Sequence, residues 1–353
     1  MKVLFDHQIF YYQYGGASKY FAMLLNAMPR DSWETTALFA CNEYVRDKHL
    51  FRTLRNRFRG QSVVAEYLNR PYTQYVLAKG EYDIFHQTNF GTYCLKNLGN
   101  KPMVTTYHDA NLSTIDPHPE IVQRQKISLN RADAVVCVSN NTKNDLLKLF
   151  DIDERKVRVI YHGIEISDNS NLTPCRLFSF PYILYVGRRS EYKNFVRLLK
   201  AFLLIRIKYP DVHLVCTSQK FSLEEQENFH QLGLDGYIHS ILADEQQMKQ
   251  LYRDALLFVF PSLYEGFGMP ILEAWAINCP VALSKASSFP EIAGSAAAFF
   301  NPLDVDEIAD VLCKIIDDED FRNELVQKGC DRVRTFSWAK TAEAHMKLYH
   351  ELL

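Results

Sequence analysis

The chain has 353 residues, of which 47% are hydrophobic and 23% are charged, and its formal net charge is −2. This length suits two domains, the composition is ordinary for a globular protein, and the near-neutral charge excludes a general attraction to nucleic acid. The start, MKVLFDHQIF, lacks a signal-peptide pattern and no run of 18 apolar residues occurs, so we expect a cytoplasmic protein. Eight cysteines are scattered without CxxC pairs, which predicts reduced, buried thiols.

Short apolar runs alternate with longer helical patterns, which is typical of βα units and parallel sheets. The strands predicted in the first half lie at 2–5, 36–39, 84–86, 103–107, 134–138 and 157–161. Because such folds bind ligands at the carboxyl ends of their strands, the residues that follow each strand are the first candidates. In this half they are Gly15, Gly16, His86, His108, Asp109 and Ser139.

Gly15 and Gly16 precede a predicted helix and would let the backbone approach a phosphate or a sugar, although a plain turn is an equal alternative. The pair is not a GxGxxG motif, which disfavours an NAD enzyme. His108 and Asp109 end a strand, where an imidazole can bind sugar hydroxyls or transfer a proton; a structural histidine is the common alternative. His86 is a weaker candidate, and no HxxxH or HExxH spacing occurs, so no catalytic metal is predicted.

Residues 48–59, KHLFRTLRNRFR, place Leu50, Phe51, Leu54 and Phe58 on one face of a predicted helix and basic residues on the other. This pattern is typical of a helix on an anionic membrane surface, and equally of an amphipathic helix that packs on its own domain. Peripheral contact with the inner face of the plasma membrane is therefore a hypothesis.

After the strand at 157–161, the polar stretch HGIEISDNSNLTPC has little periodicity and is predicted to link two domains, 1–165 and 175–336. The second half repeats the alternation, with strands predicted at 182–186, 213–216, 238–242, 256–260 and 281–283. Two successive doubly wound α/β domains with a cleft follow from this pattern. The last segment, 337–353, is a predicted helix that could pack against either domain.

The loop GRRSEYKN follows the strand at 182–186 and precedes a predicted helix at 195–207. Arg188 and Lys193 could clamp a diphosphate there, the arginine through its planar fork and the lysine as a point charge. Arg189 competes with Arg188 for this role, and a solvated basic loop is the alternative interpretation. The position at a strand end, with the loop of Glu265 two strands away, favours a site.

The most informative segment is LFVFPSLYEGFGMPILE at 257–273, in which an apolar strand turns into a helix. Gly268 and a neighbouring glycine allow a tight turn, and Pro270 suits the first turn of the helix. Backbone N–H groups at a helix start lack internal partners and attract phosphate. Glu265 lies on the loop and Glu273 one or two turns into the helix, so the segment suits a sugar nucleotide.

Asp304 and Asp306 form a DVD triplet that could be mistaken for the metal-binding DxD motif of some sugar transferases. Glu307 follows Asp304 by three residues, ahead of an apolar helical pattern. This spacing indicates that Asp304 caps a helix.

Together these segments resemble the retaining family 4 glycosyltransferases of the GT-B fold over essentially the whole chain. The resemblance rests on residues 187–194, on PSLYEGFGMPILEAWAINCPVALSKASSFPEIAG with its E-x7-E pair, and on FFNPLDVDEIADVL. YGGASKYF, YHDA and CVSNNTKNDL are similar to the glycine loop, cleft histidine and following strand-end segment of that family. Members with such an N-terminus often act in bacterial surface polysaccharide assembly, commonly as mannosyltransferases.

The resemblance implies transfer of a sugar from a nucleotide-diphosphate donor to a hydroxyl of a growing glycan or lipid-linked saccharide, without cofactor or metal. Arg188 and Lys193 would hold the donor diphosphate, Glu273 the ribose diol and Glu265 the donor sugar. GDP-mannose is the favoured donor, with UDP-linked sugars close behind. A sugar-nucleotide epimerase and a non-catalytic nucleotide-sugar-binding protein stay open as alternatives.

For the remaining candidates, the resemblance implies that backbone N–H groups of Phe267, Gly268 and Met269 lie near sugar and phosphate. His108 would line the sugar pocket, Gly16 would approach the diphosphate from the first domain, and the helix at 337–353 would cross back to that domain. The acceptor-side candidates are Gly15, His86, Asp109 and Ser139. Asn278 stands where a glycine is frequent, and CTS at 216–218 replaces the usual small-glycine turn, so base recognition is open.

Overall fold

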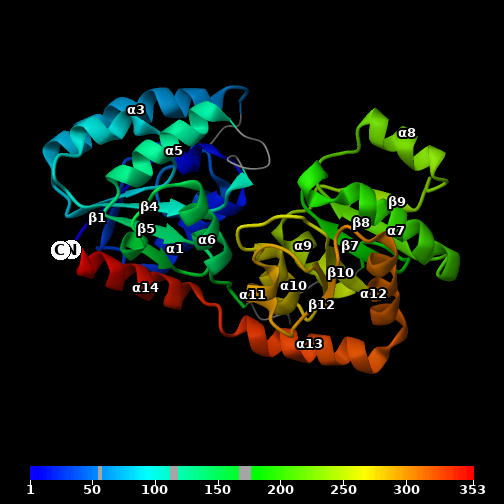
Figure 1. Ribbon diagram of the computed structural model, residues 1–353. Helices are drawn as coiled ribbons and strands as arrows, with labels where there is room; N and C mark the ends of the chain where they lie inside the picture. The colour runs from blue at the N-terminus through cyan, green and yellow to red at the C-terminus, as the bar shows by residue number, and fades with distance from the viewer. Residues whose placement is uncertain (55–57, 112–117, 167–175) are drawn as a thin grey trace. The chain divides into compact units, whose positions relative to one another are not determined.

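The computed structural model describes residues 1–54, 58–111, 118–166 and 176–353 (Figure 1). The chain divides into two compact units, of which the first contains Met1–Gly163 with Ser337–Leu353 and the second contains Ile164–Phe336. Each unit is built on a six-stranded sheet whose pairings are all parallel. The predicted α/β class with two doubly wound sheets is confirmed. Residues 167–175 of the predicted linker lie outside the described residues.

The first unit has the strand order β2-β1-β3-β4-β5-β6. Its strands are β1 (Val3–Phe5), β2 (Trp33–Thr35), β3 (Ile84–Gln87), β4 (Met103–Tyr107), β5 (Ala134–Cys137) and β6 (Val157–Val159). Its helices are α1 (Gly16–Ala27), α2 (Glu43–Asp47), α3 (Gln61–Lys79), α5 (Pro119–Arg131), α6 (Asn140–Leu149) and α14 (Trp338–Glu351), with 3-10 turns η1 (Gln8–Tyr11), η2 (Thr92–Asn97) and η3 (Glu154–Lys156). Helices α3 and α5 lie on one face of the sheet, and α1 and α14 on the other (Figure 1).

The strand predicted at 36–39 is wrong, because the second strand of the sheet is β2, three residues earlier. The register pairs Val3 with Trp33, whose side chain is buried. The backbone N–H groups of Leu38 and Phe39 instead donate to Oδ1 of Asn69 in α3, at 2.9 and 3.2 Å. A side chain thus replaces a neighbouring strand as their partner, and the segment leaves the sheet.

The amphipathic helix predicted at 48–59 is also wrong for the described residues, since 48–54 and 58–59 are not helical and 55–57 lie outside them. His49 has a positive φ of 51°, which ends the helical path after α2. Leu50 is only 8% exposed, and Phe51 packs edge-on against Phe10. Leu50 and Phe51 therefore pack on their own unit, whereas Phe58 is exposed, and the helix on which the membrane hypothesis rested is not formed by the described residues. None of the described helices is both long and apolar enough to cross a bilayer.

The second unit has the strand order β12-β11-β10-β7-β8-β9. Its strands are β7 (Tyr182–Val186), β8 (His213–Thr217), β9 (Ile238–Ile241), β10 (Leu257–Phe260), β11 (Val281–Ser284) and β12 (Ala298–Phe300). Its helices are α7 (Phe195–Lys208), α8 (Leu223–Gln231), α9 (Glu245–Asp254), α10 (Met269–Ala276), α11 (Phe289–Ala293), α12 (Val305–Asp317) and α13 (Glu319–Val333), with the 3-10 turn η5 (Glu191–Lys193). The short strand β12 was not among the predicted strands.

The strand order of this unit reverses direction at β7, which pairs with β8 on one side and with β10 on the other. In an open parallel sheet this reversal sends the connections that follow the two strands to opposite faces, so a crevice forms at their carboxyl ends. The basic loop follows β7 and the loop of Glu265 follows β10. The two loops therefore follow neighbouring strands, not strands that are two apart as predicted.

Asp304 caps α12, as the sequence predicted, because its Oδ1 accepts from the backbone N–H groups of Asp306 and Glu307 at 3.1 and 3.0 Å. The described cysteines are all free and most of them are buried, which agrees with the prediction of reduced thiols; Cys175 lies outside the described residues.

Asn278 adopts a φ of 60°, a left-handed conformation that asparagine tolerates and that glycine more often supplies.

Buried histidines bond α14 to the rest of the first unit. Nδ1 of His345 donates to the carbonyl oxygen of Thr341 at 2.8 Å, and since a carbonyl only accepts, Nε2 accepts from the Tyr20 hydroxyl at 2.9 Å. His86 lies between the Tyr349 hydroxyl at 2.6 Å and the Thr106 hydroxyl at 2.9 Å. The neutral imidazole of His345 is thus the form that satisfies its surroundings.

Burial lowers the pKa of His345 and of His108 to about 4, and it also lowers the pKa of His86 and of His162 well below the ordinary value of 6.5. A histidine whose pKa is lowered by folding binds fewer protons in the folded state than in the unfolded state. The stability that it contributes is complete above pH 6.5 and is lost as the pH falls toward 4.

We expect the free energy of unfolding in urea to fall as the pH drops from 6.5 to 4. A His345→Gln variant lacks one of the titrating groups, so the slope of this free energy against pH should decrease by about one proton, about 1.4 kcal/mol per pH unit. Comparison of the variant with the wild type cancels the contributions of other groups. Equal slopes for both proteins would show that His345 does not titrate differently on folding.

Candidate functional site

The ends of β7 and β10 are joined by an ion pair between Lys193 and Glu265. Lys193 closes the turn η5, Glu265 lies on the loop after β10, and Nζ of the lysine contacts Oε1 of the glutamate. The two side chains are 13% and 15% exposed, so the pair is only partly accessible to water. The backbone N–H of Leu263 also donates to the carbonyl of Tyr192 at 2.7 Å, which holds the two loops together.

Two serines of the loop after β11 position the backbone of Glu265. The hydroxyl of Ser287 lies 3.1 Å from the backbone nitrogen of Glu265 and 2.6 Å from its carbonyl oxygen, and the Ser288 hydroxyl donates to the same carbonyl at 2.9 Å. Sequence reasoning missed both residues, because a serine pair after a strand has no distinctive pattern. They fix the loop from a third strand end, so the carboxylate rests on a rigid base.

The turn from the Glu265 loop into α10 requires the glycine that the sequence offers. Gly268 precedes the helix with a φ of 99°, and a Cβ there would lie 2.9 Å from Ile271 Cδ1 and 3.0 Å from Phe289. Phe267 and Met269 on either side are buried, and Pro270 occupies the first turn as predicted. The first turn of α10, where backbone N–H groups favour anions, therefore follows the carboxylate directly in the chain.

Glu273 lies one turn further along α10 and is held by the hydroxyl of Tyr252, which donates to its Oε2 at 3.3 Å. Tyr252 is itself fully buried, and burial raises its pKa well above the ordinary value, with the carboxylate of Glu273 adding to this effect. The phenol is thus a fixed donor. The sequence predicted the glutamate but not the tyrosine that orients it.

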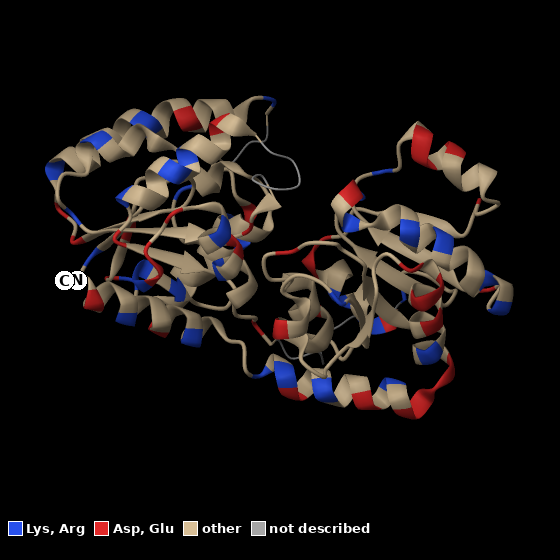
Figure 2. Cartoon of the chain, in the orientation of Figure 1, with Lys and Arg blue, Asp and Glu red and all other residues tan. Residues whose placement is uncertain are grey.

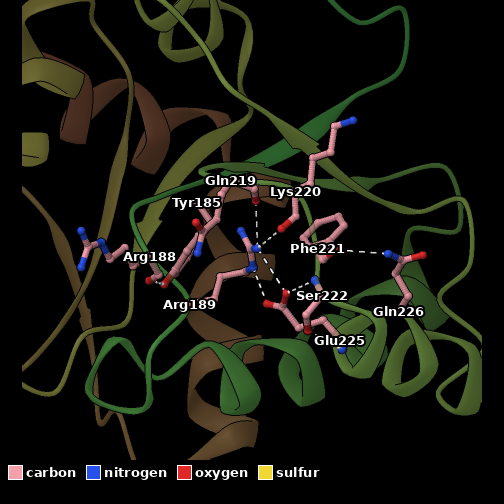
Figure 3. Close-up of polar contacts among 9 residues, drawn as sticks. All are labelled: Tyr185, Arg188, Arg189, Gln219, Lys220, Phe221, Ser222, Glu225 and Gln226. Carbon is pink, nitrogen blue, oxygen red and sulfur yellow. Dashed lines mark hydrogen bonds and ion pairs between the residues drawn. The ribbon is translucent and has the colours of Figure 1, made fainter. Parts of the chain in front are cut away.

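The structure separates the roles of the two adjacent arginines. Arg189 donates to Glu225 at 2.5 Å and to the carbonyls of Gln219 and Lys220 at 2.9 and 3.2 Å, and its side chain is only 5% exposed in the ion pair. Its guanidinium also lies 4.6 Å from the ring centroid of Phe221. Figure 3 shows this network, with the side chain of Arg188 pointing away from it.

Arg188 is exposed, and its carbonyl oxygen accepts from the buried hydroxyl of Tyr185 at 2.7 Å. Within the described part of the chain, its guanidinium forms no hydrogen bond or ion pair with another side chain. Of the two candidates for a diphosphate clamp, Arg188 is thus the arginine whose charge is available. Figure 2 shows acidic and basic residues mixed along both units, so positive charge for a ligand must be local.

Two first-unit candidates lie in the core, and we correct their assignment to the acceptor side. His86 is fully buried in β3, with both ring nitrogens bonded to hydroxyls. Ser139 is fully buried and caps α6, where its hydroxyl accepts from the backbone N–H of Thr142 at 3.0 Å. Neither side chain can contact a ligand in this structure, and both stabilise the fold instead.

The other first-unit candidates lie in loops or, for Gly16, at the first position of α1. Gly15 is the residue before α1, and a Cβ at Gly16 would meet no atom within 4 Å, so the backbone there is open to a ligand. Asp109 accepts from the backbone N–H of Asn111 at 3.0 Å. His108 follows β4, and its buried Nε2 has no hydrogen-bond partner among the described residues. With its pKa lowered to about 4 by burial, its imidazole is neutral near pH 7.

No group of three or more His, Cys, Asp or Glu side chains is arranged to hold a metal ion within the ranges that the structure describes. The candidate site consists of the pair of Lys193 and Glu265, with Arg188 on the loop after β7 and Glu273 on α10, which follows the Glu265 loop. It offers two cations, two oriented carboxylates and a helix start.

Replacement of each arginine by alanine should separate structure from ligand binding. Arg189→Ala removes the partner of a partly buried carboxylate and two carbonyls, and should lower the free energy of unfolding by about 2 kcal/mol. Arg188→Ala removes an exposed side chain and should change it by less than about 0.5 kcal/mol. Urea unfolding of the two variants is the measurement, and each serves as the control for the other. Equal destabilisation would contradict the division.

Two protein-family descriptions match the chain in succession. Residues 14–168 match "Glycosyltransferase Family 4", and residues 179–332 match "Glycosyl transferases group 1". The relatives include O-antigen chain mannosyltransferase B of Escherichia coli, 28% identical over 75% of this chain and 74% of that protein. The serotype-specific mannosyltransferase WbdA of Escherichia coli is 28% identical over 66% of this chain. The matched region covers only 31% of the length of WbdA.

Solved structures share the fold. The crystal structure of Anabaena Alr3699/HepE in complex with UDP and glucose superposes with a TM-score of 0.81 at 19% identity, over 99% of this chain and 100% of that one. Sucrose-phosphate synthase from Thermosynechococcus elongatus gives a TM-score of 0.77 at 18% identity, over 99% and 98%. With two matched regions that follow the two units, the protein belongs to the glycosyltransferases of the GT-B fold, a family 4 region followed by a group 1 region.

Proposed function

We propose that this protein is a retaining glycosyltransferase that moves mannose from GDP-mannose to a hydroxyl of a growing glycan or lipid-linked saccharide. The observation that carries the proposal is the pair of Lys193 and Glu265 at the point where the strand order reverses, followed by the first turn of α10. The mannosyltransferase names of the relatives from Escherichia coli support the choice of sugar. UDP remains the second choice of nucleotide, since HepE was crystallised with it.

The ion pair explains how the site can be ready for the donor without an uncompensated charge. Lys193 and Glu265 satisfy each other while no ligand is bound, and both are shielded from water. In the proposed complex, the donor diphosphate becomes the partner of Lys193 and Arg188, and the hydroxyls of the donor sugar become the partners of Glu265. Glu273, oriented by Tyr252, would hold the ribose diol with its two oxygens.

In the proposed reaction, the acceptor hydroxyl attacks the anomeric carbon while the bond from that carbon to the diphosphate breaks. Negative charge grows on the departing phosphate, and Lys193, Arg188 and the N–H groups of Phe267, Gly268 and Met269 would stabilise it. A departing phosphate oxygen takes the proton of the acceptor, so no side-chain base is required.

We also propose that the enzyme needs neither cofactor nor divalent metal, because cationic side chains and backbone N–H groups supply the charge that a metal would otherwise provide. A sugar-nucleotide epimerase is the alternative, and a non-catalytic nucleotide-sugar-binding protein is the third possibility. The family matches do not favour either one. The two alternatives differ from a transferase in the reaction they give. An epimerase converts the donor without an acceptor, and a binding protein binds the donor without turnover.

Lys193→Ala should reduce kcat by about a hundredfold or more, because it removes one preorganised donor to the leaving phosphate, on the order of 3 kcal/mol. The measurement is steady-state transfer from GDP-mannose to an acceptor glycan. Lys200→Ala, an exposed lysine of α7, is the matched control and should keep wild-type activity. Activity of Lys193→Ala within threefold of the wild type would exclude this lysine from the clamp.

Metal independence has a separate test, in which the wild-type enzyme is assayed in EDTA. Loss of activity there would contradict the proposal that no divalent metal is needed.

A thermal-shift panel of GDP, UDP, ADP and dTDP should single out GDP. A nucleotide at 100 times its dissociation constant stabilises the folded state by about 2.7 kcal/mol, which is readily measured as a rise in Tm. No shift with any of the four would contradict the donor assignment.

Conversion of the donor should also depend on added acceptor. Product formation without an acceptor would identify an epimerase instead.

A further inference from the structure

The first unit contains a cavity of about 290 Å³ that the proposed donor site does not use. Its walls come from η1, which follows β1, from the start of η2, which follows β3, and from α3 and α5. The strand order of this sheet reverses between β1 and β3, since β2 lies beyond β1 and β4 beyond β3. The cavity thus occupies the position at which parallel α/β sheets bind ligands.

The floor of this cavity is held by a buried carboxylate. Asp6 follows β1 and accepts from the backbone N–H of Thr88, at 2.8 Å, and from the side chains of Thr88 and Gln8. The other end of the Gln8 amide accepts from the backbone N–H of Gly91 at 2.8 Å, and a Cβ at Gly91 would lie 2.1 Å from that oxygen. The ends of β1 and β3 are therefore tied rigidly together, with Gln8 at the surface of the cavity.

One wall of the cavity is a fixed aromatic ring with a guanidinium on it. The hydroxyl of Tyr93 lies 3.1 Å from Nδ1 of His7, which in turn lies 2.7 Å from the hydroxyl of Thr73 in α3. Cζ of Arg70 lies 4.9 Å from the centroid of the Tyr93 ring. Tyr93 cannot turn away without breaking this chain of bonds, so Arg70 rests on a rigid support.

The positive charge in the cavity is available to a ligand. Within the described residues Arg70 forms no ion pair or hydrogen bond, and its contact is the ring of Tyr93. Arg124 reaches Glu120 only at 3.9 Å, and both of these side chains are largely exposed, so that pair is weak. Two guanidinium groups and the single carboxylate of Glu66 line the cavity, which leaves one positive charge in excess.

We propose that this cavity binds the acceptor, and that the acceptor is a saccharide with an anionic group. The proposal rests on the proposed function, which assigns the donor to the second unit and requires a second substrate. Arg70 and Arg124 would bind the phosphate or carboxylate through their forked N–H groups. The faces of Tyr11 and Tyr93 would pack against the sugar ring, and the carboxylate of Glu66 would accept hydrogen bonds from its hydroxyls.

The test is a calorimetric titration of the full chain with α-mannose 1-phosphate, glucuronic acid, methyl mannoside and inorganic phosphate. We expect the anionic sugars to bind at least tenfold more tightly than methyl mannoside or phosphate alone. Arg70→Gln and Arg124→Gln should each weaken that binding about tenfold or more, since each removes a charge-assisted hydrogen-bond donor. Lys126→Gln on α5 removes an exposed charge that does not line the cavity and should bind like the wild type.

Three results would each overturn the proposal. The arginine variants could bind the anionic sugars as tightly as the wild type does, methyl mannoside could bind the wild type as tightly as the anionic sugars do, or inorganic phosphate could bind as tightly as mannose 1-phosphate. Melting curves of the variants should match the wild type, because Arg70 and Arg124 are exposed. The nucleotide panel tests the other unit. A chain that binds GDP but no anionic sugar would refute this inference alone, and the reverse result would refute the proposed donor.

Discussion

The ion pair between Lys193 and Glu265 is the contact on which the candidate site depends. It joins the ends of two strands that are neighbours in the sheet but more than 70 residues apart in the chain. The reversal of strand order at β7 brings these ends together, and Ser287 and Ser288 hold the carboxylate loop from a third strand end. A charged pair of this kind is a poor source of stability, so its position in the sheet indicates a ligand site.

Local patterns predicted much of this architecture. The apolar runs predicted most of the strands, the turn around Gly268 predicted the start of α10, and Asp304 was predicted to cap α12. Each of these features depends on residues within a few positions of one another. The ranking of Glu265, Glu273 and Lys193 as candidates followed from their places at strand ends. Their actual roles stay a prediction, whereas their convergence on one edge of a sheet is now visible in the fold.

The errors arose where distant residues decide. His86 ends a predicted strand, but its partner Tyr349 lies 263 residues further along the chain. Ser139 is the exception, because it follows a strand and its role, the cap of α6, is local. The segment 48–59 has the periodicity of a helix, yet Leu50 and Phe51 pack into the core in a non-helical path. Arg188 and Arg189 are adjacent and chemically identical. Glu225 and the carbonyls of Gln219 and Lys220, all of which follow β8, hold Arg189 in place, whereas Arg188 stays exposed.

The composition of the first unit has a consequence for the order of folding. Its core includes α14, whose His345 and Tyr349 bond to Tyr20 and His86, although α14 follows the whole second unit in the chain. The second unit is one continuous stretch and can complete itself as soon as it leaves the ribosome. The first unit keeps an incomplete apolar face until α14 has also been synthesised, so it matures after the second unit although most of it is made earlier.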